Sequence, residues 1–171
     1  EAYAAHPELL PTEEEERAMY YETKAFLKSK GYERYEISNY AKPGYECRHN
    51  LSYWERADYL GLGLGAASLL GNIRKSNQTE LSEYLKGNFA GEEDILDETA
   101  AMEEYFFLGL RKMQGVDWTP YQEQYQKIVE KLVSEKLLEI DGVYIRLTEL
   151  GIDVSRSEEH TSELQSPGLI S

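Results

Sequence analysis

Four adjacent residues offer most of the side-chain chemistry that a functional site in this chain could use. Cys47, Arg48, His49 and Asn50 offer in turn a thiol, a guanidinium, an imidazole and an amide. A Cys and a His separated by one residue can begin a zinc site, but zinc needs four ligands, usually from two such pairs. The chain has one cysteine, so we expect no metal site here. Arg48 suits a bidentate pair with a carboxylate; the alternative is a structural salt bridge. His49 has two alternatives, a ligand contact or a brace within a loop.

A second candidate is the alternating run Gly61-Leu62-Gly63-Leu64-Gly65. Three positions without a Cβ let a flat ligand or another strand lie against the main chain, and tight packing alone is the structural alternative. The run also matches a relaxed dinucleotide fingerprint, which requires a helix immediately afterwards and an acid about twenty residues on. Residues 68–72 do not begin a convincing helix, which disfavours a dinucleotide site.

A third candidate pair, Glu36 and Ser38, lies in the segment 32–40. Its alternation of side chains predicts a strand, with Tyr35 and Ile37 on one face and Glu36 and Ser38 on the other. If the apolar face packs on helices, the polar face is directed toward a ligand. A general-base role for Glu36 would need a partner and a raised pKa, and the sequence provides evidence of neither.

The elements that must position these residues begin with a helix. Thr12 suits an N-cap, Glu15 completes a capping box, and Gly31 suits the residue that ends the helix. The predicted strand 32–40 follows at once, and a helix followed by a strand is half of a βα repeat. The turn at 42–44, Lys-Pro-Gly, ends the strand.

Further elements follow from the same local signals. Residues 73–75 are expected to pair with the glycine-rich segment 58–70, residues 80–85 to form a short helix, and the polar segment 87–97 to be a domain boundary. Helices are expected at 98–112 and 121–136. A hairpin is expected from 137–140 and 143–147 around an Asp-Gly turn, followed by a short helix capped by Thr148.

Composition restricts the class of protein. The net charge of −14 argues against broad nucleic-acid binding, which needs clustered lysine and arginine. No run approaches the roughly 18 apolar residues of a membrane helix. A single cysteine fits a reducing compartment. We therefore expect a cytoplasmic protein with no nucleic-acid partner and no integral membrane segment.

Three linked blocks carry a family resemblance: YEISNYAKPG at 35–44, RHNLSYW at 48–54 and YLGLGLGAAS at 59–68. In this order they resemble the oxygen-independent coproporphyrinogen III oxidase-like radical-SAM family, and most closely its haem-chaperone branch. The resemblance implies an α/β fold, the C-terminal part of an incomplete radical-SAM (β/α) barrel followed by a small α+β winged-helix-like domain. We expect the barrel end and its β extension at 1–90 and the winged-helix-like domain at 95–155.

The resemblance also implies cofactors and ligands. S-adenosylmethionine and a [4Fe-4S] cluster belong to the full-length protein, but the cluster motif CxxxCxxC lies upstream of these blocks, and Cys47 alone cannot replace three thiolates. We therefore expect this chain to be inactive by itself, with no catalytic residue and no metal ligand assigned. The expected cofactor-binding residues are Glu36, Ser38, Gly63, Gly65 and Ala67; the position of Ala67 lies near S-adenosylmethionine in related oxidases, where most of the family has His.

Haem is the ligand that the resemblance implies, with Arg48, His49 and Asn50 as the residues that contact it and haem-acceptor proteins as partners. Two alternatives stay open. One is a true oxidase that decarboxylates two propionates of coproporphyrinogen III, and the other is a non-enzymatic winged-helix module with a regulatory or scaffolding role. The last residues, 156–171, resemble a translated sequencing adapter and are expected to be a non-native tail.

Overall fold

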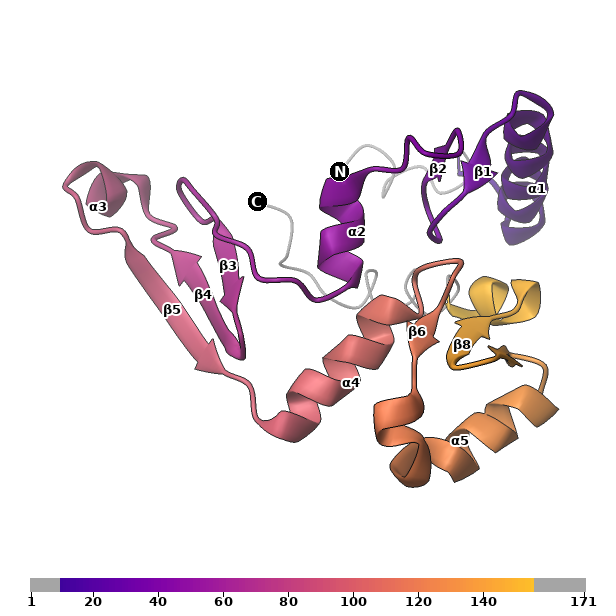
Figure 1. The fold of residues 1–171 in the computed structure, drawn as a ribbon. Coiled ribbons are helices and arrows are strands. Elements are labelled where there is room, and N and C mark those ends of the chain that lie inside the picture. The colour runs from indigo at the N-terminus through magenta and orange to yellow at the C-terminus, as the bar shows by residue number, and fades with distance from the viewer. Residues whose placement is uncertain (1–9, 156–171) are drawn as a thin grey trace. The chain divides into compact units, whose positions relative to one another are not determined.

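The computed structural model describes residues 10–155, so the non-native tail expected at 156–171 lies outside the described residues. The chain divides into two compact units, Glu1–Cys47 and Arg48–Ser171, which are treated separately below (Figure 1). Among the described residues, no helix has the length and apolar character needed to cross a membrane.

The first unit contains the predicted helix, α1 (Glu13–Ser29). The Thr12 side chain accepts the Glu15 N–H, and the Glu15 carboxylate accepts the Thr12 N–H at 2.8 Å, which completes the capping box. At the other end Gly31 has a φ of +79°. Its N–H bonds the Lys28 carbonyl while the Tyr32 N–H bonds the Leu27 carbonyl, so the helix ends in a Schellman motif as the sequence predicts.

The strand predicted over 32–40 is wrong, because the chain reverses within it. Strand β1 (Glu33–Arg34) pairs antiparallel with β2 (Tyr40–Ala41). The Ser38 N–H bonds the Glu36 carboxylate at 2.9 Å, which closes the turn between the strands. Serine and asparagine, here Ser38 and Asn39, favour turns, and at this position they outweigh the alternation of side chains.

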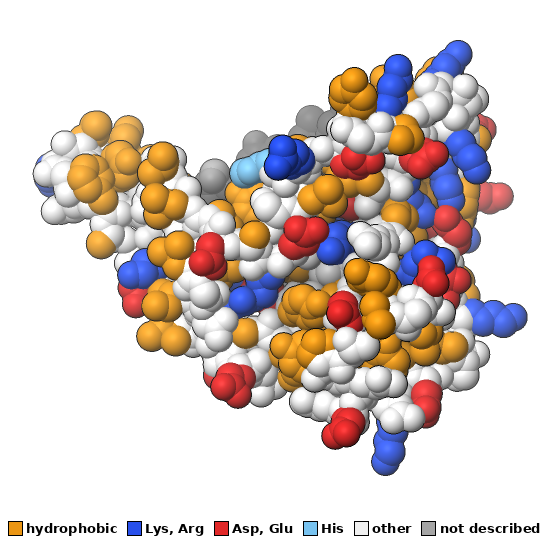
Figure 2. Space-filling view, in the orientation of Figure 1, with side chains coloured by type: hydrophobic (Ala, Val, Ile, Leu, Met, Phe, Trp, Pro, Cys, Tyr) orange, Lys and Arg blue, Asp and Glu red, His pale blue; other side chains and the backbone are white. Residues whose placement is uncertain are grey.

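The second unit begins with α2 (Arg48–Trp54) and a three-stranded antiparallel sheet in the order β3-β4-β5. Its strands are β3 (Ala67–Leu70), β4 (Ile73–Asn77) and β5 (Ala90–Ile95), with α3 (Leu81–Leu85) between the last two. The pairing of β3 with β4 and the short helix α3 confirm the predictions. Hydrophobic side chains gather at the α3 end of this sheet (Figure 2), where Leu81, Leu85 and Phe89 are exposed.

Strand β5 occupies the acidic segment that was expected to be a boundary between domains. Its acids lie opposite bases of β4: Asp94 is in register with Arg74, and Glu93 with Lys75. Lys75 Nζ lies 2.7 Å from Glu93 Oε2. Cross-strand pairs of opposite charge stabilise a strand whose own residues have low β-propensity. The domain ranges 1–90 and 95–155 stay predictions.

The rest of the second unit follows the predicted order of helices and hairpin. It comprises α4 (Glu98–Gly109), β6 (Val116–Asp117), the 3₁₀ helix η2 (Thr119–Tyr121), α5 (Gln122–Ser134), β7 (Leu138–Asp141) and β8 (Tyr144–Leu147). Residues 149–155 are helical, and Thr148 Oγ1 accepts the Gly151 N–H at 3.0 Å, as a cap does. The sheet order is β6-β8-β7, and the short strand β6 was not predicted.

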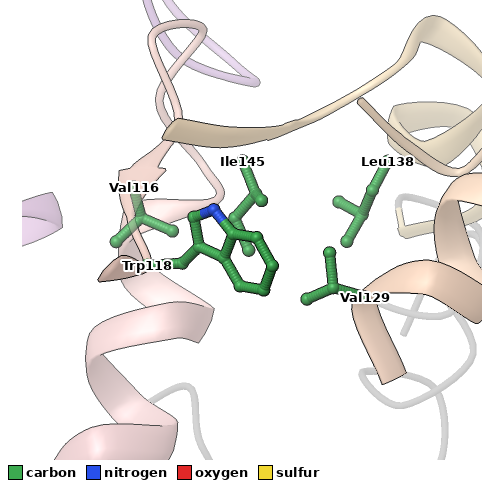
Figure 3. Packing of buried hydrophobic residues seen from close by; sticks show 5 residues of the cluster. All are labelled: Val116, Trp118, Val129, Leu138 and Ile145. Atoms are coloured by element: carbon green, nitrogen blue, oxygen red, sulfur yellow. The ribbon is translucent and has the colours of Figure 1, made fainter. Parts of the chain in front are cut away.

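The core of this C-terminal part is a cluster of five buried side chains from α5, the residue before η2 and the three strands: Val116, Trp118, Val129, Leu138 and Ile145 (Figure 3). Ile145 is 2% exposed and lies on the central strand of the three-stranded sheet. All strand pairs within residues 10–155 are antiparallel. The described part of the chain is therefore a mixed α/β structure with small antiparallel sheets.

Candidate functional site

The glycine run forms a loop that folds against its own strand. A Cβ on Gly61 would lie 2.1 Å from the carbonyl oxygen of Ala67, closer than any side chain tolerates. The Gly61 N–H also donates to Ser68 Oγ, a buried hydroxyl, at 2.9 Å. Close backbone approach is thus confirmed at Gly61, and the group that approaches is β3 of the same chain.

Asn77, a residue that the sequence did not single out, holds this loop in place. Its Nδ2 donates to the Gly63 carbonyl at 2.7 Å and to the Gly61 carbonyl at 3.3 Å. Gly63 has a φ of +116°, and no heavy atom lies within 4 Å of the place where its Cβ would be. Gly65 has a φ of +66°, and its N–H bonds the Gln78 carbonyl at 2.9 Å. Around Gly63 the loop therefore has open space, unlike at Gly61.

The RHN residues lie in the first turn of α2. Arg48 and His49 are exposed, and Asn50 is half-buried. Arg48 forms no ion pair with any residue of the described range, so its guanidinium is available to an anion. The structural salt bridge that was the alternative for Arg48 is not seen in residues 10–155.

An aromatic series connects α2 with the glycine loop. The ring centroids of His49 and Tyr53 are 4.7 Å apart at an interplanar angle of 77°, and Tyr53 meets Tyr59 in the same geometry. Tyr59 in turn exchanges backbone hydrogen bonds with Leu69 of β3, at 2.8 and 3.0 Å. The structure thus brings the RHN block and the glycine loop together through Tyr53 and Tyr59.

Glu36 and Ser38 belong to the first unit and do not share an exposed face. Glu36 is fully buried and its carboxylate holds the Ser38 N–H, whereas the Ser38 side chain is exposed. The predicted common face is therefore wrong, because the two residues lie in a turn rather than a strand. Their role toward a cofactor stays a prediction.

A pocket of about 500 Å³ lies where the β3–β4 turn and the residues after α2 meet α4 and η2. Arg56 and Tyr105 are among the residues that line it, and Arg56 Nη2 donates to Asn72 Oδ1 at 3.1 Å. The Tyr105 hydroxyl donates to the Asp117 carbonyl at 3.0 Å. Burial raises the pKa of the Tyr105 phenol, and the Asp117 carboxylate raises it further. Arg56 and Tyr105 are thus each held by a neighbouring residue, and a sequence search by motif could not have found them.

The donors present do not fit an iron–sulfur cluster. The sequence has one cysteine, Cys47, which is exposed. Within residues 10–155 no three His, Cys, Asp or Glu side chains are grouped so that they could hold a metal ion. A cluster associated with this protein would need thiolates from outside residues 1–171.

Comparison with known proteins gives the family context of this geometry. Residues 96–154 match the HemN C-terminal domain. The heme chaperone HemW of Lactococcus lactis is 33% identical over 159 residues, which cover 86% of this chain and 42% of that protein. HemW of Bacillus subtilis is 34% identical over 136 residues, which cover 77% of this chain and 36% of the relative. The chain thus spans about two-fifths of the length of these relatives.

A solved structure shows the same fold. It is described as coproporphyrinogen III oxidase (HemN) from Escherichia coli, a radical SAM enzyme. The TM-score is 0.65 at 22% identity, with 86% of this chain and 40% of that chain covered. The family resemblance stated from the sequence blocks is confirmed by these matches. Residues 96–154 thus match the HemN C-terminal domain, and the chain is similar to the HemW heme chaperones over most of its length.

Proposed function

We propose that this chain is the haem-binding part of a radical-SAM haem chaperone, which binds haem and transfers it to acceptor proteins. The observation that carries the proposal is the similarity to proteins named heme chaperone HemW over 86% of this chain, including the α2 block. Because the chain covers 42% of that relative, the activity of a whole protein is part of the proposal. We further propose that residues 1–90 correspond to the end of the barrel and its β extension.

The first turn of α2 supplies groups that suit haem. Imidazole is a common axial ligand of haem iron, and His49 presents an exposed imidazole braced by Tyr53. Arg48 would pair with a propionate through charge-assisted hydrogen bonds, with Asn50 beside it. We also propose that five residues contribute to cofactor binding: Gly63, Gly65, Ala67, Glu36 and Ser38. S-adenosylmethionine and an iron–sulfur cluster held by cysteines outside residues 1–171 would supply radical chemistry. We assign the residues of this chain no step in that chemistry.

Haem titration of the 171-residue chain, followed by the Soret band, tests the proposal. His49→Ala should remove the axial ligand, shift the Soret band and weaken binding at least about tenfold. The matched control is the double variant His6→Ala with His160→Ala, which removes the two other histidines of the sequence and should leave the spectrum unchanged. Equal binding by wild type and His49→Ala, or no haem binding by wild type, would overturn the proposal.

Arg48→Ala separates propionate recognition from iron ligation. Loss of a charge-assisted bond of about 1.5–3 kcal/mol should weaken haem binding by roughly tenfold to a hundredfold. Haem dimethyl ester, which has no free propionates, should bind wild type and variant alike. Preferential binding of coproporphyrinogen III over haem would instead favour the oxidase.

A further inference from the structure

The last residue of α2 and the two residues that follow it are each held by a charged side chain of the HemN C-terminal domain. The pairs are Trp54 with Arg111, Glu55 with Lys112, and Arg56 with Glu104. The Arg111 guanidinium carbon lies 4.5 Å from the Trp54 ring centroid, Lys112 Nζ lies 3.7 Å from Glu55 Oε1, and Arg56 Nε lies 2.9 Å from Glu104 Oε2. One end of the short helix is therefore fastened to α4 and the turn that follows it.

Glu104 is the central member of this set. Its second carboxylate oxygen bonds Arg74 of β4, so one carboxylate holds arginines from two segments that are 18 positions apart in sequence. The Arg56 and Glu104 side chains are only 13% and 18% exposed. Removing one partner of an ion pair shielded from water leaves an uncompensated charge, and here it would also leave two arginines facing each other.

Arg56 follows the end of α2, and Glu104 holds its side chain. Arg56 has a φ of +53°, the left-handed conformation of the residue that ends a helix in a Schellman motif: its N–H bonds the Tyr53 carbonyl, and the Ala57 N–H bonds the Ser52 carbonyl. These local bonds direct the chain away from the helix axis, and the ion pair with Glu104 then fixes where the Arg56 side chain lies. Moreover, α2 has seven residues, too few for a stable isolated helix, so tertiary contacts must hold it.

We infer that Glu104 is a positioning residue for the haem site, acting through Arg56 on α2 and so on His49. This inference rests on the proposed function. His49 and Arg48 lie at the start of α2, and the residues held by the HemN C-terminal domain, 54–56, lie at its end and just after it. Because α2 has seven residues and depends on these contacts, loss of the contacts at its end changes the orientation of His49 at its start. The HemN C-terminal domain thus serves as the support against which the haem-binding helix is oriented.

The test measures haem affinity, the Soret spectrum and the thermal midpoint of Glu104→Gln, Arg56→Gln and the double variant. Glu104→Gln should weaken haem binding about tenfold and broaden the Soret band, as expected for a residue that acts through others. The double variant should lose less than the sum of the two single variants, because both changes break one connection. The matched control is Glu139→Gln, which breaks an exposed ion pair with Arg146 in the same domain and should leave haem binding unchanged.

Two outcomes overturn the inference. If Glu104→Gln lowers the thermal midpoint while haem affinity and spectrum stay as in wild type, Glu104 has a structural role alone. If wild type binds no haem, the proposed function fails. Hydrogen exchange then tests by itself whether Glu104 holds α2 in place. Exchange of the amides of residues 51–54 should be faster in Glu104→Gln than in Glu139→Gln. Equal exchange would show that Glu104 does not hold α2.

Discussion

Gly61→Ala tests whether the glycine loop is packed against β3 as tightly as the structure has it. The new Cβ would lie 2.1 Å from the Ala67 carbonyl oxygen and 2.8 Å from its carbonyl carbon. Both are backbone atoms, so no side chain can turn aside. The loop and the strand would have to separate by about 1.3 Å to reach an ordinary contact distance.

That separation has a cost that can be worked out from the hydrogen bonds it affects. It would break the bond from the Gly61 N–H to Ser68 Oγ and lengthen the 3.3 Å bond from Asn77 Nδ2 to the Gly61 carbonyl. Leaving a buried polar group such as the Ser68 hydroxyl unsatisfied costs about 1–3 kcal/mol. With the weakened second bond we expect a loss of about 2–4 kcal/mol, or a melting temperature lower by roughly 8–16 °C for a unit of this size.

Tryptophan fluorescence during thermal unfolding is the appropriate assay, because both tryptophans, Trp54 and Trp118, belong to the second unit. Gly142→Ala is the comparison: nothing lies within 4 Å of a Cβ there, and its φ of +61° costs about 1–2 kcal/mol, a backbone cost that does not arise at Gly61. A Gly61→Ala protein that melts within 1 °C or so of wild type would refute the close approach.

Three further predictions concern single side chains. Ile145→Ala should destabilise the second unit by about 3–4 kcal/mol in urea unfolding, because Ile145 is 2% exposed in the core cluster; a loss under about 1 kcal/mol would contradict that packing. Backbone and side-chain hydrogen bonds from Thr12 hold the pKa of Glu15 below its usual 4.5. The capping box therefore contributes stability above that pH and loses it as the pH falls through the lowered pKa. Glu15→Gln should abolish this acid-dependent loss of helix in circular dichroism. Burial and Asp117 raise the pKa of Tyr105 above its usual 10, so the neutral phenol stabilises the fold up to that pH and less as the pH rises through the raised value. In an ultraviolet titration, Tyr105→Phe should lack one phenolate that wild type forms above pH 10.

Local signals in the sequence predicted local structure well. The capping box of α1, its Schellman end at Gly31 and the β7–β8 hairpin each depend on residues within a few positions of one another. The same holds for the pairing of β3 with β4 across a short turn. In each case the stabilising partner is close in sequence, so its identity could be read directly.

Contacts between distant residues explain what the sequence did not reveal. Strand β5 depends on Arg74 and Lys75 of β4, and the Arg56–Glu104 pair joins residues 48 positions apart. Glutamates are common on the surface of this acidic chain, so nothing distinguished Glu104 from the others. The reversal at 35–39 was missed for a different reason: an alternating pattern of five residues is compatible with both a strand and a turn.

The glycine loop also shows why a motif does not by itself assign a ligand contact. At Gly63 a side chain has room, yet the φ of +116° strains any substitution. Gly63→Val in the chain should therefore weaken ligand binding through the backbone alone, whether or not a ligand lies there. Asn77→Ala offers the needed comparison, because it releases the loop from its bonds at Gly61 and Gly63 without adding a side chain. If a ligand lies against Gly63, Gly63→Val should weaken haem or S-adenosylmethionine binding well beyond Asn77→Ala at equal loss of stability. Equal effects on binding would show that the alternating glycines shape the loop and do not contact the ligand.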